Sequence, residues 1–243
     1  MIEVDAAPAV PAVSLEGLRF AWPAADAPCV AMERFAVAAG ERVFLCGPSG
    51  SGKTTLLSLI GGVLEAQAGR VVVCGQDLGA LRAGARDRFR ADHIGFVFQL
   101  FNLIPYLSAR DNILLPCRFS ALRSQRVREA GRSPEAEAER LAAHLDLDRG
   151  LLDRPAAELS VGQQQRVAAA RALIGRPPLV IADEPTSALD ADRQRGFLEL
   201  LLGECAAAGA ALLFVSHDAR LAAHFDRVVA LDEINRATGG GGA

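Results

Sequence analysis

Lysine is nearly absent from this sequence. Lysine and arginine together number 26, and Lys53 is the only lysine among them. The 29 acidic residues outnumber the basic ones, so the formal net charge is −3 at neutral pH. A protein whose main partner is nucleic acid generally carries a basic surface. The charge balance therefore argues against nucleic acid as a partner.

Long hydrophobic runs and a basic leader are also missing. The longest apolar stretch, residues 205–215, is too short to cross a bilayer and is interrupted by Gly209. The first residues carry Glu3 and Asp5 instead of the basic start of a signal peptide. We therefore expect a cytoplasmic chain that reaches a membrane only by binding a partner.

The cysteines form no recognisable metal or redox motif. None of the five belongs to a C-x-x-C pair, and no cysteine and histidine cluster has metal-ligand spacing. Most lie in apolar runs, so we expect reduced, buried thiols in a reducing compartment. They are Cys29, Cys46, Cys74, Cys117 and Cys205.

The single lysine lies in a motif that binds phosphate. The motif reads G-x-x-x-x-G-K-T and comprises Gly47, Pro48, Ser49, Gly50, Ser51, Gly52, Lys53 and Thr54, with Thr55 following. An apolar strand at 42–46 precedes it and a helix at 53–60 follows, which is the context this motif requires. Its backbone N–H groups and the helix N-terminus would hold a polyphosphate. Lys53 would neutralise the β- and γ-phosphates, and the Thr54 hydroxyl would bind Mg²⁺.

A second motif supplies carboxylates. The apolar strand 179–182 ends directly in Asp183 and Glu184. In a parallel sheet, the carboxyl ends of the strands face the ligand crevice. Asp183 would hold Mg²⁺ through water, and Glu184 would orient the attacking water or accept its proton. A strand that ends in a solvated acidic turn is the alternative.

The order of expected elements predicts an α/β fold. Strands and helices alternate at both ends of the chain, whereas residues 100–175 are nearly all helical. We predict a P-loop NTPase core with a mostly parallel sheet, an N-terminal antiparallel β subdomain and an inserted helical subdomain. One domain would span 13–231, with the core at 13–99 and 176–231 and the helical subdomain at 100–175. Residues 1–12 and 232–243 would be tails, with 238–243 disordered.

Several further segments resemble the ATP-binding cassette (ABC) family. Residues 159–173 read LSVGQQQRVAAARAL, which strongly resembles the family signature, and residues 187–190 match its Ser-Ala-Leu-Asp turn. Gln99 and His217 each follow an apolar strand, as do the Q-loop glutamine and switch histidine of the family. The resemblance implies that Gln99 contacts the metal and His217 the γ-phosphate. It also implies that an aromatic residue, Trp22 or its neighbour Phe20, stacks on adenine.

The resemblance also implies a dimer. Ser160, Gly162 and Gln163 open a helix, and a helix start is a second anion site. In ABC proteins this helix start reaches the nucleotide of the other subunit, so two copies arranged head to tail would bury two ATP molecules. Val161 departs from the family, which usually has glycine there. A positive φ at this position would make valine costly, whereas a position that tolerates a side chain would leave Gly162 to keep the close contact.

Three uses of ATP hydrolysis are possible for such a cassette. The apolar segment 98–107, the segment 108–113 and the end 233–237 favour a transporter motor that docks on a separately encoded permease. This pattern resembles the lipoprotein-release and macrolide-export branch, which implies a place on the cytoplasmic face of the membrane. A DNA-repair ATPase would carry a long coiled coil, and a translation factor would carry two cassettes. A P-loop kinase outside the family would lack the signature and His217.

The remaining basic and histidine residues have no assigned role. The arginine-rich stretch 118–132 reads as a solvated helix face and a linker between helices at 108–119 and 134–145. Contact with a partner or with lipid headgroups is its alternative role. His93, His144 and His224 lack a matching context and are expected on the surface or in packing.

Overall fold

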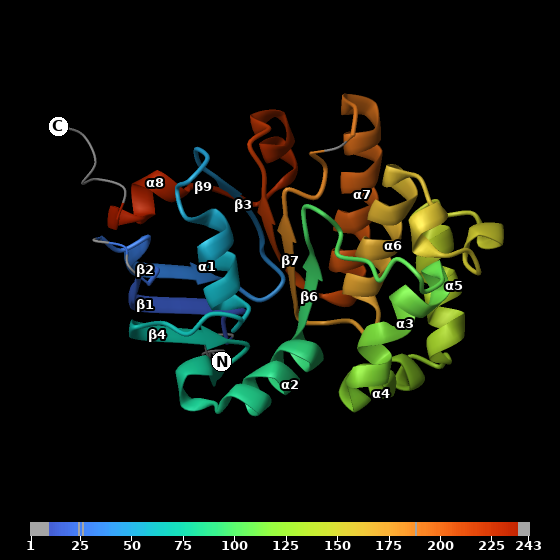
Figure 1. Cartoon of the computed structure of the whole chain (residues 1–243), viewed down its shortest axis with the longest axis horizontal. Coiled ribbons are helices and arrows are strands. Elements are labelled where there is room, and N and C mark those ends of the chain that lie inside the picture. The colour runs from blue at the N-terminus through green and yellow to red at the C-terminus, as the bar shows by residue number, and fades with distance from the viewer. Residues whose placement is uncertain (1–9, 24, 26, 188, 238–243) are drawn as a thin grey trace, which may run out of the picture.

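The computed structural model describes residues 10–23, 25, 27–187 and 189–237 (Figure 1). Two sheets lie side by side, with the helices gathered mainly beyond the larger sheet. The strands are β1 (Val13–Phe20), β2 (Val30–Val37), β3 (Arg42–Cys46), β4 (Ala68–Val73), β5 (Gln76–Asp77), β6 (Ile94–Val97), β7 (Leu179–Asp183), β8 (Ala211–Val215) and β9 (Arg227–Ala230). The α-helices are α1 (Lys53–Ile60), α2 (Ala83–His93), α3 (Ala109–Phe119), α4 (Ala121–Glu129), α5 (Pro134–His144), α6 (Val161–Leu173), α7 (Ala191–Ala208) and α8 (Leu231–Ile234).

The larger sheet is parallel and has the strand order β6-β7-β8-β3-β9. Its central strands are apolar on both faces, as expected for a parallel sheet covered on both sides. Along β3, Phe44 packs with the helices, whereas Val43 and Leu45 pack toward the smaller sheet. This alternation divides the core into two clusters, one on each face of the sheet.

The smaller sheet is antiparallel, with the order β2-β1-β4-β5. Its inward side chains, including Leu15, Leu18 and Phe35, belong to the same cluster as α1. The two-residue strand β5 is too short for any sequence pattern to predict. The expected α/β class, the parallel sheet and the N-terminal antiparallel strands are confirmed.

The inserted region contains helices α3 to α6, which lie together beyond β6 in Figure 1. The expectation of a solvated helix face and linker at 118–132 is wrong in part, because the linker contains a further helix and one of its arginines is buried. Residues 121–129 form α4, capped by the Ser120 side chain, which accepts a hydrogen bond from the Arg123 backbone. The Arg123 side chain is 1% exposed, so at least one arginine of this stretch belongs to the core.

The C-terminal residues differ from the expected tail up to residue 237. Helix α8 packs beside β2 and β9 (Figure 1), and Leu231 is fully buried. The expected disorder at 238–243 falls outside the described residues, as does nearly all of the N-terminal tail. Within the described part of the chain, no helix is long and apolar enough to span a membrane.

Candidate nucleotide site

The predicted phosphate and carboxylate motifs meet in one cavity of about 600 Å³. The cavity lies at the carboxyl ends of β3, β6, β7 and β8, where a parallel sheet presents its ligand crevice. Its lining consists of Cys29, Gly47, Pro48, Ser49, Gly50, Gly52, Lys53, Thr54, Thr55, Gln99, Asp183, Glu184 and His217. Residues far apart in sequence thus converge as the motifs predict. Ser51 belongs to the loop but is buried beneath it.

The phosphate loop has the backbone of an anion cradle. Gly50 and Gly52 have φ values of 80° and 95°, a conformation that side chains disfavour. Gly52 caps α1 without any side-chain hydrogen bond, which leaves the N–H groups of the first turn for a ligand. The Lys53 ammonium donates to the carbonyl oxygens of Gly47 and Pro48, each at 2.8 Å. The positive charge is therefore held over the loop, where phosphate oxygens would meet it.

Thr54 and Asp183 form an oxygen pair in the same cavity. The Thr54 hydroxyl donates to Asp183 Oδ2 at 3.1 Å. Burial raises the pKa of the Asp183 carboxyl, the Glu184 charge adds to that rise, and the Thr54 hydrogen bond opposes it. Among the described residues, no group of three or more His, Cys, Asp or Glu side chains could hold a metal ion. A threonine hydroxyl and one carboxylate fit Mg²⁺, which keeps several waters and takes phosphate oxygens as further ligands.

Glu184 is held in an unusual backbone conformation. Its φ is +44°, in the left-handed region that non-glycine residues seldom adopt. Its N–H donates to the Val215 carbonyl at 2.9 Å, which ties the turn after β7 to the end of β8. Its Oε2 lies 3.0 Å from Nδ1 of His217. Strained backbone of this kind often accompanies functional sites, and here it aims a carboxylate into the cavity.

The signature residues lie elsewhere. Ser160, Val161, Gly162 and Gln163 line a separate cavity of about 420 Å³ that shares no lining residue with the first. The Ser160 and Gln163 side chains form a capping box at the start of α6. Val161 is the first helical residue and has no positive φ. Valine therefore causes no backbone strain at this position. Its side chain is half exposed at the helix start.

Trp22 is not among the residues that line either cavity. It is 47% exposed and packs edge-on against Phe20, with ring centroids 5.2 Å apart. Phe20 is 7% exposed and belongs to the core. Of the two aromatic candidates, Trp22 is therefore the exposed one.

Cys29 is a site residue that the sequence did not indicate. Its Sγ lies 3.6 Å from the Thr55 hydroxyl, and the residue lines the nucleotide cavity. The five cysteines are free, as predicted, but only Cys117 and Cys205 are buried. Cys29 belongs to no motif, and its contacts are with distant segments, including Thr55 and Asn235.

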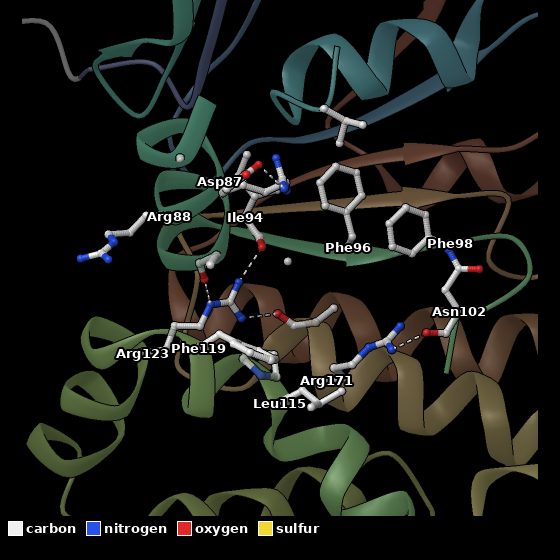
Figure 2. Close-up of a pocket in the computed structure, with 17 residues that line it drawn as sticks. Asp87, Arg88, Ile94, Phe96, Phe98, Asn102, Leu115, Phe119, Arg123 and Arg171 are labelled. Carbon is white, nitrogen blue, oxygen red and sulfur yellow. Dashed lines mark hydrogen bonds and ion pairs between the residues drawn. The ribbon is translucent and has the colours of Figure 1, made fainter. Parts of the chain in front are cut away.

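A further hollow, of about 630 Å³, shares no lining residue with either of these cavities (Figure 2). It is an apolar groove between β6, α2 and α3, with the rings of Phe96 and Phe98 stacked 5.1 Å apart. Phe119, 76% exposed, stands at the α3 side. Leu100 and Tyr106, in the segment after Gln99, are among the most exposed hydrophobic residues of the described chain. Large contiguous apolar patches on a protein surface are typical of interaction sites.

Two arginines line this groove, and each donates hydrogen bonds to backbone carbonyls (Figure 2). Arg123 donates to the carbonyls of Ala91 and Ile94, and to those of Ala172 and Ile174 at the end of α6. Burial lowers the pKa of Arg123 to about 10. Arg171, whose pKa burial also lowers to about 10, donates to the carbonyls of Phe101 and Asn102. Helix α6, which begins with the signature, is thus bonded to both the groove and the segment after Gln99.

Comparison with known proteins gives the family. The model of the ABC transporter family matches residues 32–187, well over half of the chain. The chain belongs to the ABC transporter family. It is an ATP-binding subunit with ATPase activity, so the predicted class and reaction are confirmed, and a soluble non-transport ATPase is not favoured.

The relatives include lipoprotein-releasing system ATP-binding proteins named LolD. The chain is 43% identical to the one from Chromohalobacter salexigens over 197 residues, which cover 81% of this chain and 80% of that protein. The match to the Ruegeria protein is 40% over 224 residues and covers 91% and 95%. The protein from Novosphingobium aromaticivorans is 44% identical over 199 residues, covering 80% and 83%.

Solved structures confirm the fold. A dimeric post-hydrolysis state of the ATP-binding cassette MJ0796, bound to ADP and phosphate, superimposes with a TM-score of 0.80. The two sequences are 32% identical, and the match covers 90% of this chain and 93% of the other. A further dimeric structure of MJ0796, described as a bacterial ABC transporter cassette, gives a TM-score of 0.79 at 31% identity.

Proposed function

We propose that two copies of this chain close head to tail around two ATP molecules and power a separately encoded membrane permease. The observation that carries this proposal is the separation of the two anion-binding surfaces. The phosphate loop and the signature helix start line different cavities of one chain. A second copy that presents its Ser160 to the first copy's phosphate loop would complete both sites at once.

Within each site, the residues have distinct roles. The backbone from Gly47 to Thr55 cradles the phosphates, and Lys53 leaves its loop carbonyls to neutralise the β- and γ-phosphate oxygens. Trp22 stacks on adenine. From the second copy, Ser160, Gly162 and the capping residue Gln163 meet the γ-phosphate with the helix N-terminus.

Hydrolysis requires a positioned water and a metal ion. Mg²⁺ held by Thr54 and Asp183, with Gln99 near it, would neutralise the charge that develops on the phosphate oxygens. Glu184 orients the attacking water and accepts its proton. His217, which here touches Glu184, exchanges that contact for the γ-phosphate when ATP is present. Until ATP binds, the link between the two side chains would keep the Glu184 carboxylate aimed into the cavity.

The groove is the proposed permease dock. Most of its lining surface is apolar, and Arg88 and Arg90 are also among its lining residues. A short cytoplasmic helix of the permease, with apolar residues on one face and an acidic residue at its edge, would fit this chemistry. The chain would then lie on the cytoplasmic face of the membrane, and the names of its relatives suggest lipoprotein release as the process that it drives.

The proposed domain boundaries separate the nucleotide-binding core from the helical subdomain. Residues 13–231 form one ABC ATPase domain, in which the core at 13–99 and 176–231 binds nucleotide. The helical subdomain at 100–175 carries the signature and one wall of the groove. Helix α8 and Asn235 extend the packed unit to about residue 235.

Trapping the dimer tests this proposal. Glu184→Gln retains the shape of the side chain and removes its basicity, so the variant should bind ATP, stall hydrolysis and elute as a dimer in size exclusion with ATP and Mg²⁺. The same variant with Ser160→Arg should remain monomeric, because the guanidinium blocks the partner's γ-phosphate site. A Glu184→Gln chain that elutes as a monomer at saturating ATP would contradict the sandwich.

A further inference from the structure

Asn235 lies far in sequence from the nucleotide-binding motifs, yet its side chain contacts the phosphate loop. It follows α8 and is 1% exposed. Its amide nitrogen donates to the Ser51 carbonyl within the loop and to the Cys29 carbonyl, each at 3.0 Å. Its amide oxygen accepts from the Ala31 N–H at 2.8 Å. One amide thus joins the C-terminal segment, the start of β2 and the phosphate loop.

The loop is closely packed at this junction. A Cβ on Gly52 would lie 2.9 Å from the Cys29 carbonyl oxygen and 3.5 Å from the Asn235 amide nitrogen. Gly52 also has a φ of 95°. The N-cap residue of α1 therefore packs directly against Cys29 and Asn235, so a shift of either would move the loop.

Through Phe20, Cys29 is also connected to Trp22. The Cys29 N–H donates to the Phe20 carbonyl at 2.8 Å, which closes the base of the loop that carries Trp22. The Trp22 ring packs on Phe20. Asn235 therefore bonds at the same time to the base of the adenine-side loop and to the phosphate loop, beside the 3.6 Å contact of Cys29 Sγ with the Thr55 hydroxyl.

We propose that Asn235 is a positioning residue for nucleotide binding that fixes the phosphate loop and the Trp22 loop at one separation. Adenine and triphosphate then bind to surfaces that are already placed for each other, which saves the entropy of ordering them. The inference rests on the proposed role of Trp22. An amide suits this position because both its donor and its acceptor are used, whereas a carboxylate would face two carbonyl oxygens.

The test compares ATP with tripolyphosphate, which carries the phosphates without the base. Both dissociation constants are measured on the full chain in EDTA by displacement of a fluorescent ATP analogue. In Asn235→Ala, the ratio of the tripolyphosphate constant to the ATP constant should fall about tenfold, the size of one lost buried hydrogen bond. Trp22→Ala should lower the same ratio, and the two changes together should lower it no further than the larger one alone. The kcat at saturating ATP should stay within about twofold.

Arg236→Ala is the matched control. Arg236 is the next residue and pairs with Glu33 at the surface of β2, so its loss should leave the ratio unchanged. Damage to the phosphate loop alone would weaken both ligands equally and leave the ratio at its wild-type value, which would overturn the inference. Additive effects of Asn235→Ala and Trp22→Ala would also overturn it. If Asn235→Ala does not fold, Asn235→Ser, which keeps a donor and an acceptor, is titrated instead with the same two outcomes.

The proposed function can fail separately. If Trp22→Ala alone leaves the ratio unchanged, the adenine assignment is wrong, whatever Asn235→Ala does. If Lys53→Ala leaves both dissociation constants unchanged, the site itself is wrong.

Discussion

Gly175 decides whether α4 can dock, and replacing it with alanine tests how the groove lining is built. Gly175 follows α6 with a φ of 75°. A Cβ added there would lie 2.4 Å from the Arg123 Cβ and 2.9 Å from its Cα. Neither atom can be moved by rotating the Arg123 side chain, so the backbone of α4 would have to shift. That shift would pull the guanidinium away from the carbonyls of α2, β6 and α6.

Gly209 supplies a control with the same backbone and open surroundings. It caps α7 with a φ of 65°, and a Cβ there would meet nothing within 4 Å. Alanine in this conformation costs roughly 1–2 kcal/mol. At Gly175 the overpacking of α4 adds about 1–3 kcal/mol. For a chain of this size, each kcal/mol lowers the melting temperature by about 2–4 °C.

Thermal unfolding followed by circular dichroism measures both variants. Gly175→Ala should melt several degrees below Gly209→Ala, and α4 should exchange its amide hydrogens faster. Equal melting temperatures for the two variants would refute the reasoning. They would mean that the close approach of Arg123 to Gly175 adds nothing to the stability cost of alanine there.

The remaining predictions concern the nucleotide site and the groove. Lys53→Ala and Lys53→Arg should both lose ATP binding in calorimetric titrations, because a planar guanidinium does not replace the ammonium between phosphate oxygens; unchanged affinity in either would exclude the assigned role. Phe119→Asp should leave the ATPase rate of the isolated chain unchanged, since the groove shares no lining residue with the nucleotide cavity. The same substitution should abolish co-purification with the permease from membranes, and normal recovery would count against the groove as the dock. Glu184→Gln should form the ATP-dependent dimer described above.

The sequence predicted those parts of the fold that a short, continuous segment encodes. The phosphate loop, the strand that ends in Asp183 and the histidine after β8 are each readable from a short segment, because strand, turn and helix signals surround them. Their meeting in one cavity follows from the rule that parallel strands present their carboxyl ends together. The separate position of the signature cavity was expected from the family resemblance.

Long-range polar contacts could not be predicted. Arg123 sits in a basic stretch with little hydrophobic periodicity, and its burial depends on carbonyls at the ends of α2 and α6. Asn235 meets Ser51 across 184 residues of sequence. No local signal predicts these contacts, because the partners are backbone groups that every residue possesses.

The expected cost of Val161 came from the resemblance, because the family usually has glycine at this position. It did not come from a backbone conformation that requires glycine. At the first position of a helix, the backbone is compatible with any L-residue, and the φ of Val161 is not positive. The capping box depends on Ser160 and Gln163, which are both present. The substitution therefore leaves the start of α6 intact and alters only the side chain that a second copy would meet.

Dependence of the ATPase rate on protein concentration tests the central claim most directly. If two copies complete each other's site, the rate per chain should fall in proportion to concentration once dilution separates the dimer, and added inactive Lys53→Ala chain should change the rate of the wild type. A rate per chain that stays constant at every dilution would contradict the account, because a single copy would then contain the whole catalytic site.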